Sequence, residues 1–386
     1  TALTPRIITC AEDRSDHVAV PRGCIDDLRD LAEKNEIRLV IDDKRFAGNR
    51  IAVKFHGELS EAQHEAVNAS LSHDMGVISA SPGTGKTVIG VYLIAERSVS
   101  TLILVHRKPL FDQWVAQISR FLEIDAKSVG RIAGPKRKIT GQVDVAMIQT
   151  LARGSVLDEM VGKYGHVLID ECHHLPAVSF ERVLGEMKAR YVTGLTATPI
   201  RRDGHHPIIH MQCGPLRYAE RPGSVKPAVS ERRLIRRSTE YRADGWSIER
   251  GIQDLYAMVA RDPRRNDLIV RNVLRAVSDG RSPIVLTERT DHVALLAARL
   301  APDVRHVIAL RGGGTDKARG AAIDALRNVP ADEPRVIVAT GRYIGEGFDD
   351  ARLDALFLAM PVSWKGRLFQ YAGRLHRSSP GKRDVH

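Results

Sequence analysis

Between residues 76 and 197, short apolar runs rich in β-branched residues alternate with longer segments of helical periodicity. The runs are GVISAS, TLILVH, VDVAMIQ, HVLIDE and YVTGLTA, and KPLFDQWVAQISRFL is one of the helical segments between them. Apolar runs separated by helices predict parallel strands that are covered by helices on both faces of the sheet. We therefore expect a doubly wound α/β lobe over residues 59–220.

The same alternation returns later in the chain, after a stretch of different composition. Residues 214–245 are rich in Arg, Pro, Gly and Ser, which is typical of a connecting region, so we expect a linker over 221–250. The runs PIVLTE, RHVIAL, RVIVAT and DALFLAM then predict a second doubly wound parallel-sheet lobe over 251–386.

Ahead of both lobes, residues 1–58 predict a small N-terminal α+β domain. Strands are expected near RIITCAED, IRLVIDD and IAVKFHG, and a helix in GCIDDLRDLAEKN. A chain of 386 residues exceeds what one hydrophobic core usually supports, which agrees with this division. The predicted fold class is thus α/β, with two doubly wound lobes and a small α+β domain.

Composition limits the partners and the location that we expect. The formal net charge of +11 favours a polyanionic partner, with nucleic acid as the first candidate and general solubility as the alternative explanation. Aromatic residues make up only 5% of the chain, so phosphate contacts are expected to outweigh base stacking. The four cysteines lie far apart without a Cys-x-x-Cys pair, which favours a reducing, cytoplasmic location. The N-terminus lacks a signal-peptide pattern and no 18 apolar residues run together, so we expect no membrane partner.

A phosphate-loop pattern, Ala80-Ser-Pro-Gly-Thr-Gly-Lys-Thr87, lies between the strand GVISAS and the helix TVIGVYLIAERS. At this position, backbone N–H groups and the positive end of the helix dipole can bind phosphate oxygens. Lys86 is expected to reach the β and γ phosphates of ATP, and the Thr87 hydroxyl to bind Mg²⁺. The alternative is an ordinary Gly-rich turn. The loop residues that we expect to contact the nucleotide are Pro82, Gly83, Thr84, Gly85, Lys86 and Thr87.

HVLIDE is an apolar strand that ends in two acids, Asp170 and Glu171. In a phosphate-loop lobe a later strand delivers an aspartate to Mg²⁺, and we expect Asp170 to take this role. Glu171 is then the candidate general base for the attacking water. A zinc site is the alternative, but adjacent residues at a strand end point in different directions, and no complementary Cys or His pair stands nearby. We expect Cys172, His173 and His174 to form the turn that follows.

Five motifs follow one another in the sequence: SPGTGKT, DECH and GLTATP in the first lobe, and ATGRYIGEGFD and QYAGRLHR in the second. They resemble motifs I, II, III, V and VI of superfamily 2 helicases. DECHHLPAVSFERVL and GLTATPIRRDG look most like the XPB-like branch and related phage and restriction-type DNA helicases, and VPRGCIDDL resembles their small N-terminal domain. The resemblance covers the chain from about residue 59 to its end and implies that both lobes are RecA-like.

The resemblance assigns further residues to the nucleotide. Arg374 and Arg377 stand three positions apart on an expected helix, so both can point from one face, and the resemblance implies that they act as arginine fingers. Surface arginines on an amphipathic helix are the alternative. The further ATP-binding residues that it implies are Gln63, Gly345, Asp349 and Gln370. Gln63 would read the adenine edge, and an exposed helix glutamine is the alternative; for Gly345 and Asp349 the alternative is a plain turn.

Three residues that follow strand ends match motifs Ia, Ib and V, namely Arg107, Thr150 and Thr340. Cations and hydroxyls at such positions can bind phosphates without reading bases, whereas solvated loop residues are the alternative. Thr196 and Thr198, in TATP, would couple the nucleotide site to the surface that binds the strand.

The predicted function is an ATP-dependent and Mg²⁺-dependent DNA helicase or translocase. Three alternatives stay open: an RNA-dependent ATPase of the same fold, a nucleic-acid-binding module without turnover, and the motor of a restriction or mobile-element defence system. The chain begins without Met, and GKRDVH stops where a final strand is expected to begin. We therefore expect further domains or subunits outside this chain.

Overall fold

The computed structural model describes residues 11–81, 83–153, 162–174, 177–197, 207–220 and 231–311, followed by 321–322, 324–326, 328–330, 332–341, 350–362, 368, 371–373, 375, 382 and 384–386. The chain divides into two compact units, Thr1–Val225 and Lys226–His386, and the division falls within the stretch expected to be a linker. Among the described residues, no helix is both long enough and apolar enough to cross a lipid bilayer.

An eight-stranded sheet forms the centre of the first unit, in the order β10-β3-β9-β8-β4-β7-β5-β6. Neighbouring strands are parallel except for the antiparallel pair β5 and β6. The five strands expected from the sequence are confirmed as β3 (Met75–Ser79), β4 (Thr101–Val105), β7 (Val143–Met147), β8 (His166–Asp170) and β9 (Tyr191–Thr196). Three further strands extend the sheet: β5 (Gly130–Ala133), β6 (Lys136–Lys138) and β10 (Leu216–Ala219).

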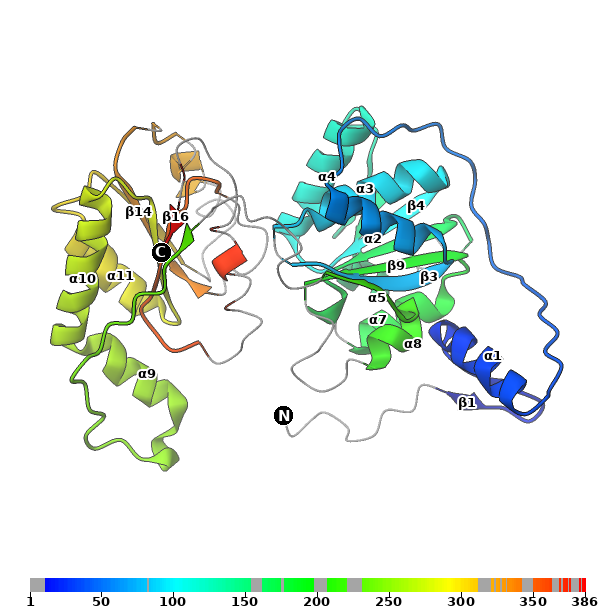
Figure 1. Ribbon diagram of the computed structural model, residues 1–386, viewed down its shortest axis with the longest axis horizontal. Helices are drawn as coiled ribbons and strands as arrows, with labels where there is room; N and C mark the ends of the chain where they lie inside the picture. Colours follow the sequence, from blue (N-terminus) through cyan, green and yellow to red (C-terminus); the bar gives the residue numbers. More distant parts are fainter. Residues whose placement is uncertain are drawn as a thin grey trace. The chain divides into compact units, whose positions relative to one another are not determined.

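Helices cover both faces of this sheet, as Figure 1 shows. The helices on one face are α2 (Glu61–Leu71), α3 (Lys86–Arg97) and α4 (Lys108–Leu122), and those on the other are α5 (Ile148–Ala152), α7 (Ala177–Glu186) and α8 (Pro207–Cys213). Successive strand residues point to opposite faces, so Val77 packs in the core beside α7 and α8, whereas Ile78 packs in the core beside α3 and α4. The strands are therefore apolar on both faces, and the doubly wound architecture is confirmed.

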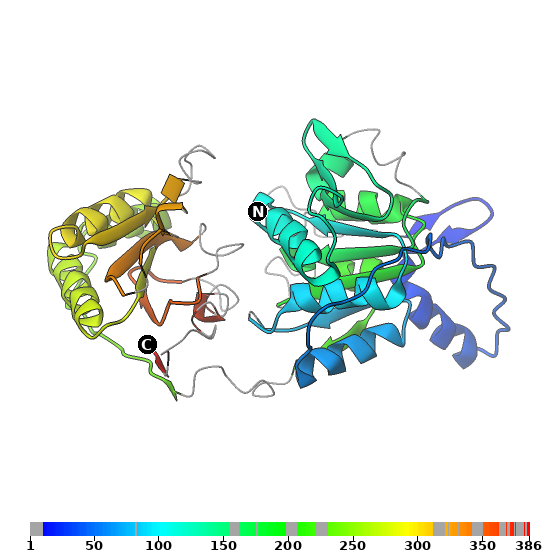
Figure 2. The ribbon, with the colours of Figure 1, turned by 90° about the horizontal axis from the view of Figure 1, so that it is seen from above.

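The N-terminal segment departs from the expected α+β domain. It contains a short hairpin of two strands with two residues each, β1 (Glu12–Asp13) and β2 (Val18–Ala19). A 3-10 turn η1 (Arg22–Cys24) and the expected helix α1 (Ile25–Lys34) follow. The prediction of strands in IRLVIDD and IAVKFHG was wrong, because residues 37–43 and 51–57 have no strand structure. Instead, the chain after α1 runs as an extended arm along the first unit (Figure 2).

Backbone hydrogen bonds to loops, and side chains that pack on one side only, explain why the arm was wrongly predicted to form strands. The N–H of Phe46 donates to the Lys188 carbonyl at 2.7 Å, and the Ser100 N–H donates to the Asn49 carbonyl at 2.7 Å, so the arm bonds to loops of the lobe. Phe55 stacks on Phe121 with ring centroids 5.4 Å apart. The alternating pattern in residues 51–57 thus reflects side chains that pack on helices, not pairing between strands.

The second unit contains a four-stranded parallel sheet in the order β13-β14-β12-β15. Its strands confirm the four that were expected: β12 (Pro283–Thr287), β13 (His306–Leu310), β14 (Arg335–Thr340) and β15 (Ala355–Leu358). The helices α10 (Pro263–Ser278) and α11 (Thr290–Leu300) pack on one face, and α9 (Gly251–Arg261) precedes them. Two short strands, β11 (Glu231–Arg232) and β16 (Asp384–Val385), pair in parallel. A hydrogen bond of 2.8 Å from the Leu356 N–H to the His386 carbonyl connects the end of β16 to β15.

Candidate nucleotide-binding site

The phosphate-loop residues connect the carboxyl end of β3 to the first turn of α3. The Ala80 N–H donates to the Thr196 carbonyl at 3.0 Å, which ties the base of the loop to the end of β9. Gly83 and Gly85 have φ values of +96° and +87°, a left-handed conformation that favours glycine, and Gly85 caps the N-terminus of α3. The loop therefore ends at a helix N-terminus, where backbone N–H groups bind anions. Pro82 lies outside the described residues.

Lys86 lies between this loop and the two acids at the end of β8. Its Nζ atom donates to the Ala80 carbonyl at 3.2 Å and lies 3.7 Å from Oε1 of Glu171. The side chains of Lys86 and Glu171 are 10% and 14% exposed, so the ion pair is largely shielded from water. The structure thus brings the predicted phosphate-binding lysine and the predicted general base together.

Asp170 is the last residue of β8 and is 4% exposed. Its Oδ2 accepts a hydrogen bond from Nε1 of Trp114 at 2.8 Å, and its Oδ1 accepts one from the Glu171 N–H at 2.9 Å. Burial, and then the nearby Glu171 carboxylate, raise the pKa of Asp170 to about 6, while Trp114 and Lys86 act in the opposite direction. A second cation near Asp170 would therefore be favourable.

Polar contacts connect Glu171 to Thr196 of β9 through His173. Glu171 has a φ of +48°, an unusual backbone conformation for a residue other than glycine and one that is common at functional sites. Its Oε2 lies 3.3 Å from Nδ1 of His173, and the same nitrogen lies 2.7 Å from Oγ1 of Thr196. His173 belongs to the 3-10 turn η2 (Cys172–His174), which confirms the turn expected there. Thr196 is thus connected to the acidic pair, whereas Thr198 lies outside the described residues.

Gln63 contacts the loop from α2. Its Nε2 donates to the Thr84 carbonyl at 2.7 Å, and its Oε1 accepts from the Ser60 N–H at 2.8 Å. Ser60 and Gln63 form a capping box at the start of α2, and the sequence pattern Ser-x-x-Gln is its signal. The amide retains one N–H and one lone pair beyond these bonds, so the expected contact with adenine stays a prediction.

Three polar contacts at the site involve two residues that the sequence patterns did not indicate. Trp114 donates to Asp170 from α4, and Glu220, which directly follows β10, accepts hydrogen bonds from Ser81 and Thr84 in the loop. In sequence, Trp114 is 56 residues from Asp170 and Glu220 is 136 residues from Thr84. No local pattern marks these contacts.

The three residues expected to bind nucleic acid lie in different surroundings. Arg107 lies two residues after the end of β4 and is the N-cap of α4. Thr150 lies in α5, and its Oγ1 accepts a hydrogen bond from the Gly134 N–H at 3.1 Å. Thr340 is the last residue of β14 in the second unit and is only 6% exposed. Contact between Thr340 and a nucleic-acid strand would therefore require local movement of the protein. The other predicted site residues that lie outside the described part of the chain are Gly345, Asp349, Gln370, Arg374 and Arg377.

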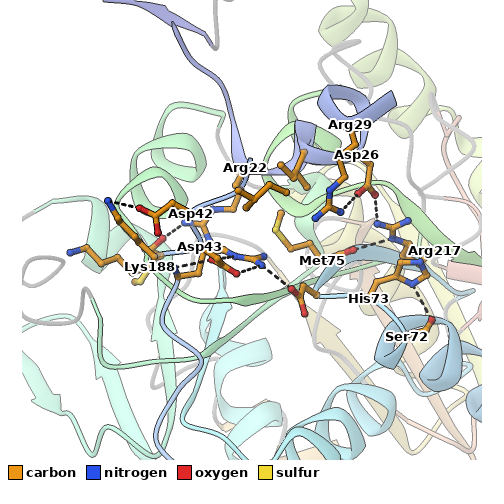
Figure 3. Close-up of a pocket in the computed structure, with 16 residues that line it drawn as sticks. Arg22, Asp26, Arg29, Asp42, Asp43, Ser72, His73, Met75, Lys188 and Arg217 are labelled. Atoms are coloured by element: carbon orange, nitrogen blue, oxygen red, sulfur yellow. Dashed lines mark hydrogen bonds and ion pairs between the residues drawn. The ribbon is translucent and has the colours of Figure 1, made fainter. Parts of the chain in front are cut away.

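A cavity of about 810 Å³ lies at the other end of the sheet, beside the start of β3, where α1 and the N-terminal arm meet the lobe (Figure 3). Arg45 pairs with Asp74 at 2.9 Å, and Arg217 pairs with Asp26 at 2.5 Å. Nη1 of Arg22 donates to the Ala189 carbonyl at 3.2 Å. Because these arginines hold η1, α1 and the arm on the lobe, the cavity lies where the N-terminal segment contacts the lobe within the first unit, and it is separate from the nucleotide site.

Known proteins resemble this chain in both sequence and fold. Residues 56–201 match the family described as type III restriction enzyme, res subunit. DNA 3'-5' translocase XPB2 of Sulfurisphaera tokodaii is 31% identical over 195 residues, which cover 50% of this chain and 42% of that protein. The putative ATP-dependent RNA helicase L396 of Acanthamoeba polyphaga mimivirus is 26% identical over 310 residues, which cover 78% of this chain and 57% of that protein. The chain thus spans about half the length of these curated relatives.

The solved structures extend the likeness beyond the first unit. S. cerevisiae Dbp5 bound to RNA and ADP BeF3 has a TM-score of 0.61 at 15% identity, over 85% of this chain and 82% of that one. The ATP-dependent Type ISP restriction-modification enzyme LlaBIII bound to DNA has a TM-score of 0.56 at 16% identity, over 86% of this chain and 28% of that one. At these identities the likeness concerns the fold, and it confirms the RecA-like α/β class that the sequence predicts.

Proposed function

Because the chain belongs to the superfamily 2 helicases, in the XPB-like and restriction-type branch, we propose that it is an ATP-dependent helicase or translocase that acts on DNA. One observation carries this proposal most directly. Lys86, at the end of a phosphate loop, lies 3.7 Å from Glu171, which follows a buried Asp170 at the end of β8. Such an arrangement suits hydrolysis of a nucleoside triphosphate.

The donor set fits a magnesium ion, with the Thr87 hydroxyl and the Asp170 carboxylate as the residues that would hold it. Burial next to a second carboxylate raises the pKa of Asp170 to about 6, which supports a cation at this position. When bound, Mg²⁺ would neutralise charge on the β and γ phosphates. Trp114 fixes the orientation of Asp170 through Oδ2, so that this carboxylate does not need to reorganise.

Lys86 and Glu171 would divide the remaining chemistry. Lys86 now donates to a backbone carbonyl of its own loop, and it would exchange that bond for phosphate oxygens. Glu171 would orient the attacking water and accept its proton. The contacts from Glu171 through His173 to Thr196 support a coupling role for Thr196, and the resemblance extends that role to Thr198.

The second lobe would complete the catalytic machinery. We propose that Arg374 and Arg377 stabilise charge in the transition state as arginine fingers, and that Gly345, Asp349 and Gln370 contribute to ATP binding. This proposal rests on the order of the motifs ATGRYIGEGFD and QYAGRLHR. The domain division that we propose is a small N-terminal domain over 1–58, an ATP-binding lobe over 59–220, a linker over 221–250 and a C-terminal lobe over 251–386.

DNA is the proposed substrate because of the net charge of +11 and the relatives named as XPB. An RNA-dependent ATPase is the second candidate, since another relative is named as a putative RNA helicase. Contacts through Arg107, Thr150 and Thr340 would bind phosphates and so would not distinguish the two. Free thiols at Cys24, Cys172 and Cys213 support a reducing, intracellular location.

An ATPase assay with single-stranded DNA, duplex DNA and RNA tests this function. We expect DNA to stimulate turnover, and we expect Lys86→Ala to remove the stimulated rate because the triphosphate loses its principal cation. Stimulation by RNA alone would move the proposal to the second candidate. Turnover that is equal in the wild type and in Lys86→Ala would refute the site itself.

A further inference from the structure

A carboxylate of the protein lies on the phosphate loop. Oε2 of Glu220 accepts a hydrogen bond from the Ser81 N–H at 2.5 Å and a second one from the Thr84 hydroxyl at 2.9 Å. A single hydrogen bond at a partly exposed position usually contributes little. Here one oxygen connects two positions on either side of the bend at Gly83, so the contact restrains the loop as a unit.

The sheet holds Glu220 in this position. Glu220 directly follows β10, in which Ala219 is in register with Ser79 of β3. The Glu220 N–H donates to the Ser79 carbonyl at 2.8 Å, so its backbone is fixed next to the start of the loop. The side chain therefore extends onto the loop from an anchored residue.

The charge of this carboxylate opposes the expected ligand. A phosphate loop concentrates N–H and hydroxyl donors, so it is a favourable place for an anion. In this structure the protein supplies that anion through Glu220. A triphosphate carries several negative charges, and like charges a few ångströms apart repel each other, more strongly where water is partly excluded.

We propose that Glu220 is an affinity-determining residue that opposes nucleotide loading, an inference that rests on the proposed ATPase function. Its carboxylate holds the loop through Ser81 and Thr84 before ATP arrives, and the incoming triphosphate has to displace or outweigh that negative charge. The effect is electrostatic, so it belongs to the charge of Glu220 and not to its ability to accept hydrogen bonds.

Titration with a fluorescent ATP analogue and Mg²⁺, without nucleic acid, tests this proposal. Glu220→Gln keeps an oxygen that can accept both hydrogen bonds but removes the charge, whereas Glu220→Ala removes both. Glu186→Gln is the matched control, because Glu186 is exposed at the end of α7, on the side of the sheet away from the loop. We expect both Glu220 variants to bind the analogue roughly two- to tenfold more tightly than the wild type, and Glu186→Gln to bind it equally.

Salt provides the second measurement. Raising the ionic strength from about 0.05 M to about 0.5 M should reduce the difference between the wild type and Glu220→Gln, because partly exposed charges are screened. Wild-type affinity in Glu220→Gln with weaker binding in Glu220→Ala would overturn the proposal, since the hydrogen bonds alone would then matter. Unchanged affinity in both variants would also overturn it. Equal binding by the wild type and Lys86→Ala is a separate outcome, which would refute the nucleotide site on which this inference rests, so the two failures are distinguishable.

Discussion

Nε1 of Trp114 donates a 2.8 Å hydrogen bond to Oδ2 of Asp170, which joins α4 to the acidic end of β8. Trp114 is fully buried and Asp170 is 4% exposed, so water is largely excluded from this bond. A buried carboxylate that lacks donors is costly, and the indole supplies one of the two donors that hold Asp170. The packing of α4 therefore sets the orientation of a catalytic candidate on a neighbouring strand.

Trp114→Phe keeps an aromatic ring in the core but removes the donor to Asp170. We expect the free energy of unfolding to fall by about 1–3 kcal/mol, because a buried acceptor loses its partner. Urea unfolding measures this change. Trp246→Phe is the control: its Nε1 donates to the Gly251 carbonyl at 3.0 Å at a partly exposed position, where water can replace it. Equal losses in the two variants would contradict the role assigned to burial.

Glu171→Gln separates nucleotide binding from hydrolysis. The amide cannot accept the proton of the attacking water, so we expect kcat to fall by about 100- to 10,000-fold. Binding of ATP should persist, because Lys86 is retained and loses only its ion pair with Glu171. Single-turnover hydrolysis and nucleotide titration, measured on the same preparation, distinguish the two effects. A rate within a few-fold of the wild type would remove Glu171 from the role of general base.

Arg374→Ala tests the expected arginine finger in the second lobe. If the guanidinium stabilises charge that develops in the transition state, the variant should bind ATP with nearly wild-type affinity and hydrolyse it much more slowly, by about 1,000-fold or more. The measurement is kcat against the dissociation constant of the nucleotide. Loss of nucleotide binding in a protein whose second unit stays folded would show that Arg374 acts on the ground state instead.

The sequence was sufficient to predict five of the eight strands of the first sheet and the four strands of the second, for a physical reason. Helix α4 begins and ends where the periodicity of KPLFDQWVAQISRFL predicts, because its apolar face follows a period of 3.6 residues. Lys86, Asp170 and Glu171 were expected to lie close together because parallel strands bring their carboxyl ends to one edge of a sheet, and a local motif marks each strand end. The structure brings Lys86 and Glu171 to within 3.7 Å of each other, whereas their catalytic roles stay predictions.

The contacts that the sequence did not reveal are those between distant segments. Glu220 reaches a loop 136 residues away because β10, a strand that was not expected, pairs with β3. Residues 37–43 and 51–57 of the arm were predicted as strands because alternation of apolar residues indicates a one-sided environment, and this can be a helix surface as well as a sheet. Ile37 and Val40 are 61% and 80% exposed, so the apolar side chains of the first predicted strand, residues 37–43, are not buried against the described residues.

Gly90 tests the close packing between α3 and α4. A Cβ atom at this position would lie 2.5 Å from Cη2 of Trp114, so Gly90→Ala should destabilise the protein by about 1–3 kcal/mol despite the better helix propensity of alanine. Gly185 in α7 is the matched control, because a Cβ there has open space around it. Gly185→Ala should stabilise by about 0.5–1 kcal/mol. Thermal or urea unfolding measures both, and opposite signs are the expected result.

His292 gives the second unit a pH-dependent contribution to stability. Its Nδ1 lies 2.8 Å from Oγ1 of Thr287 and its Nε2 lies 2.9 Å from Oδ1 of Asn266, and the side chain is buried. Burial, followed by the charge of Arg265, lowers the pKa of His292 to about 4, from an ordinary value of 6.5. The folded protein therefore holds this imidazole neutral at pH values where the unfolded chain binds a proton.

The sign of the effect follows from this difference in bound protons. The contribution of His292 is fully present above about pH 6.5 and is lost as the pH falls towards 4, by at most about 1.4 kcal/mol per pH unit. Urea unfolding between pH 7 and pH 5 measures it, since most carboxylates stay ionised in that window. A His292→Gln variant cannot titrate at this position, so its stability should decline less steeply over the same window, even if it is lower at pH 7. Parallel pH profiles for the wild type and this variant would mean that His292 takes up its proton equally in the folded and unfolded states.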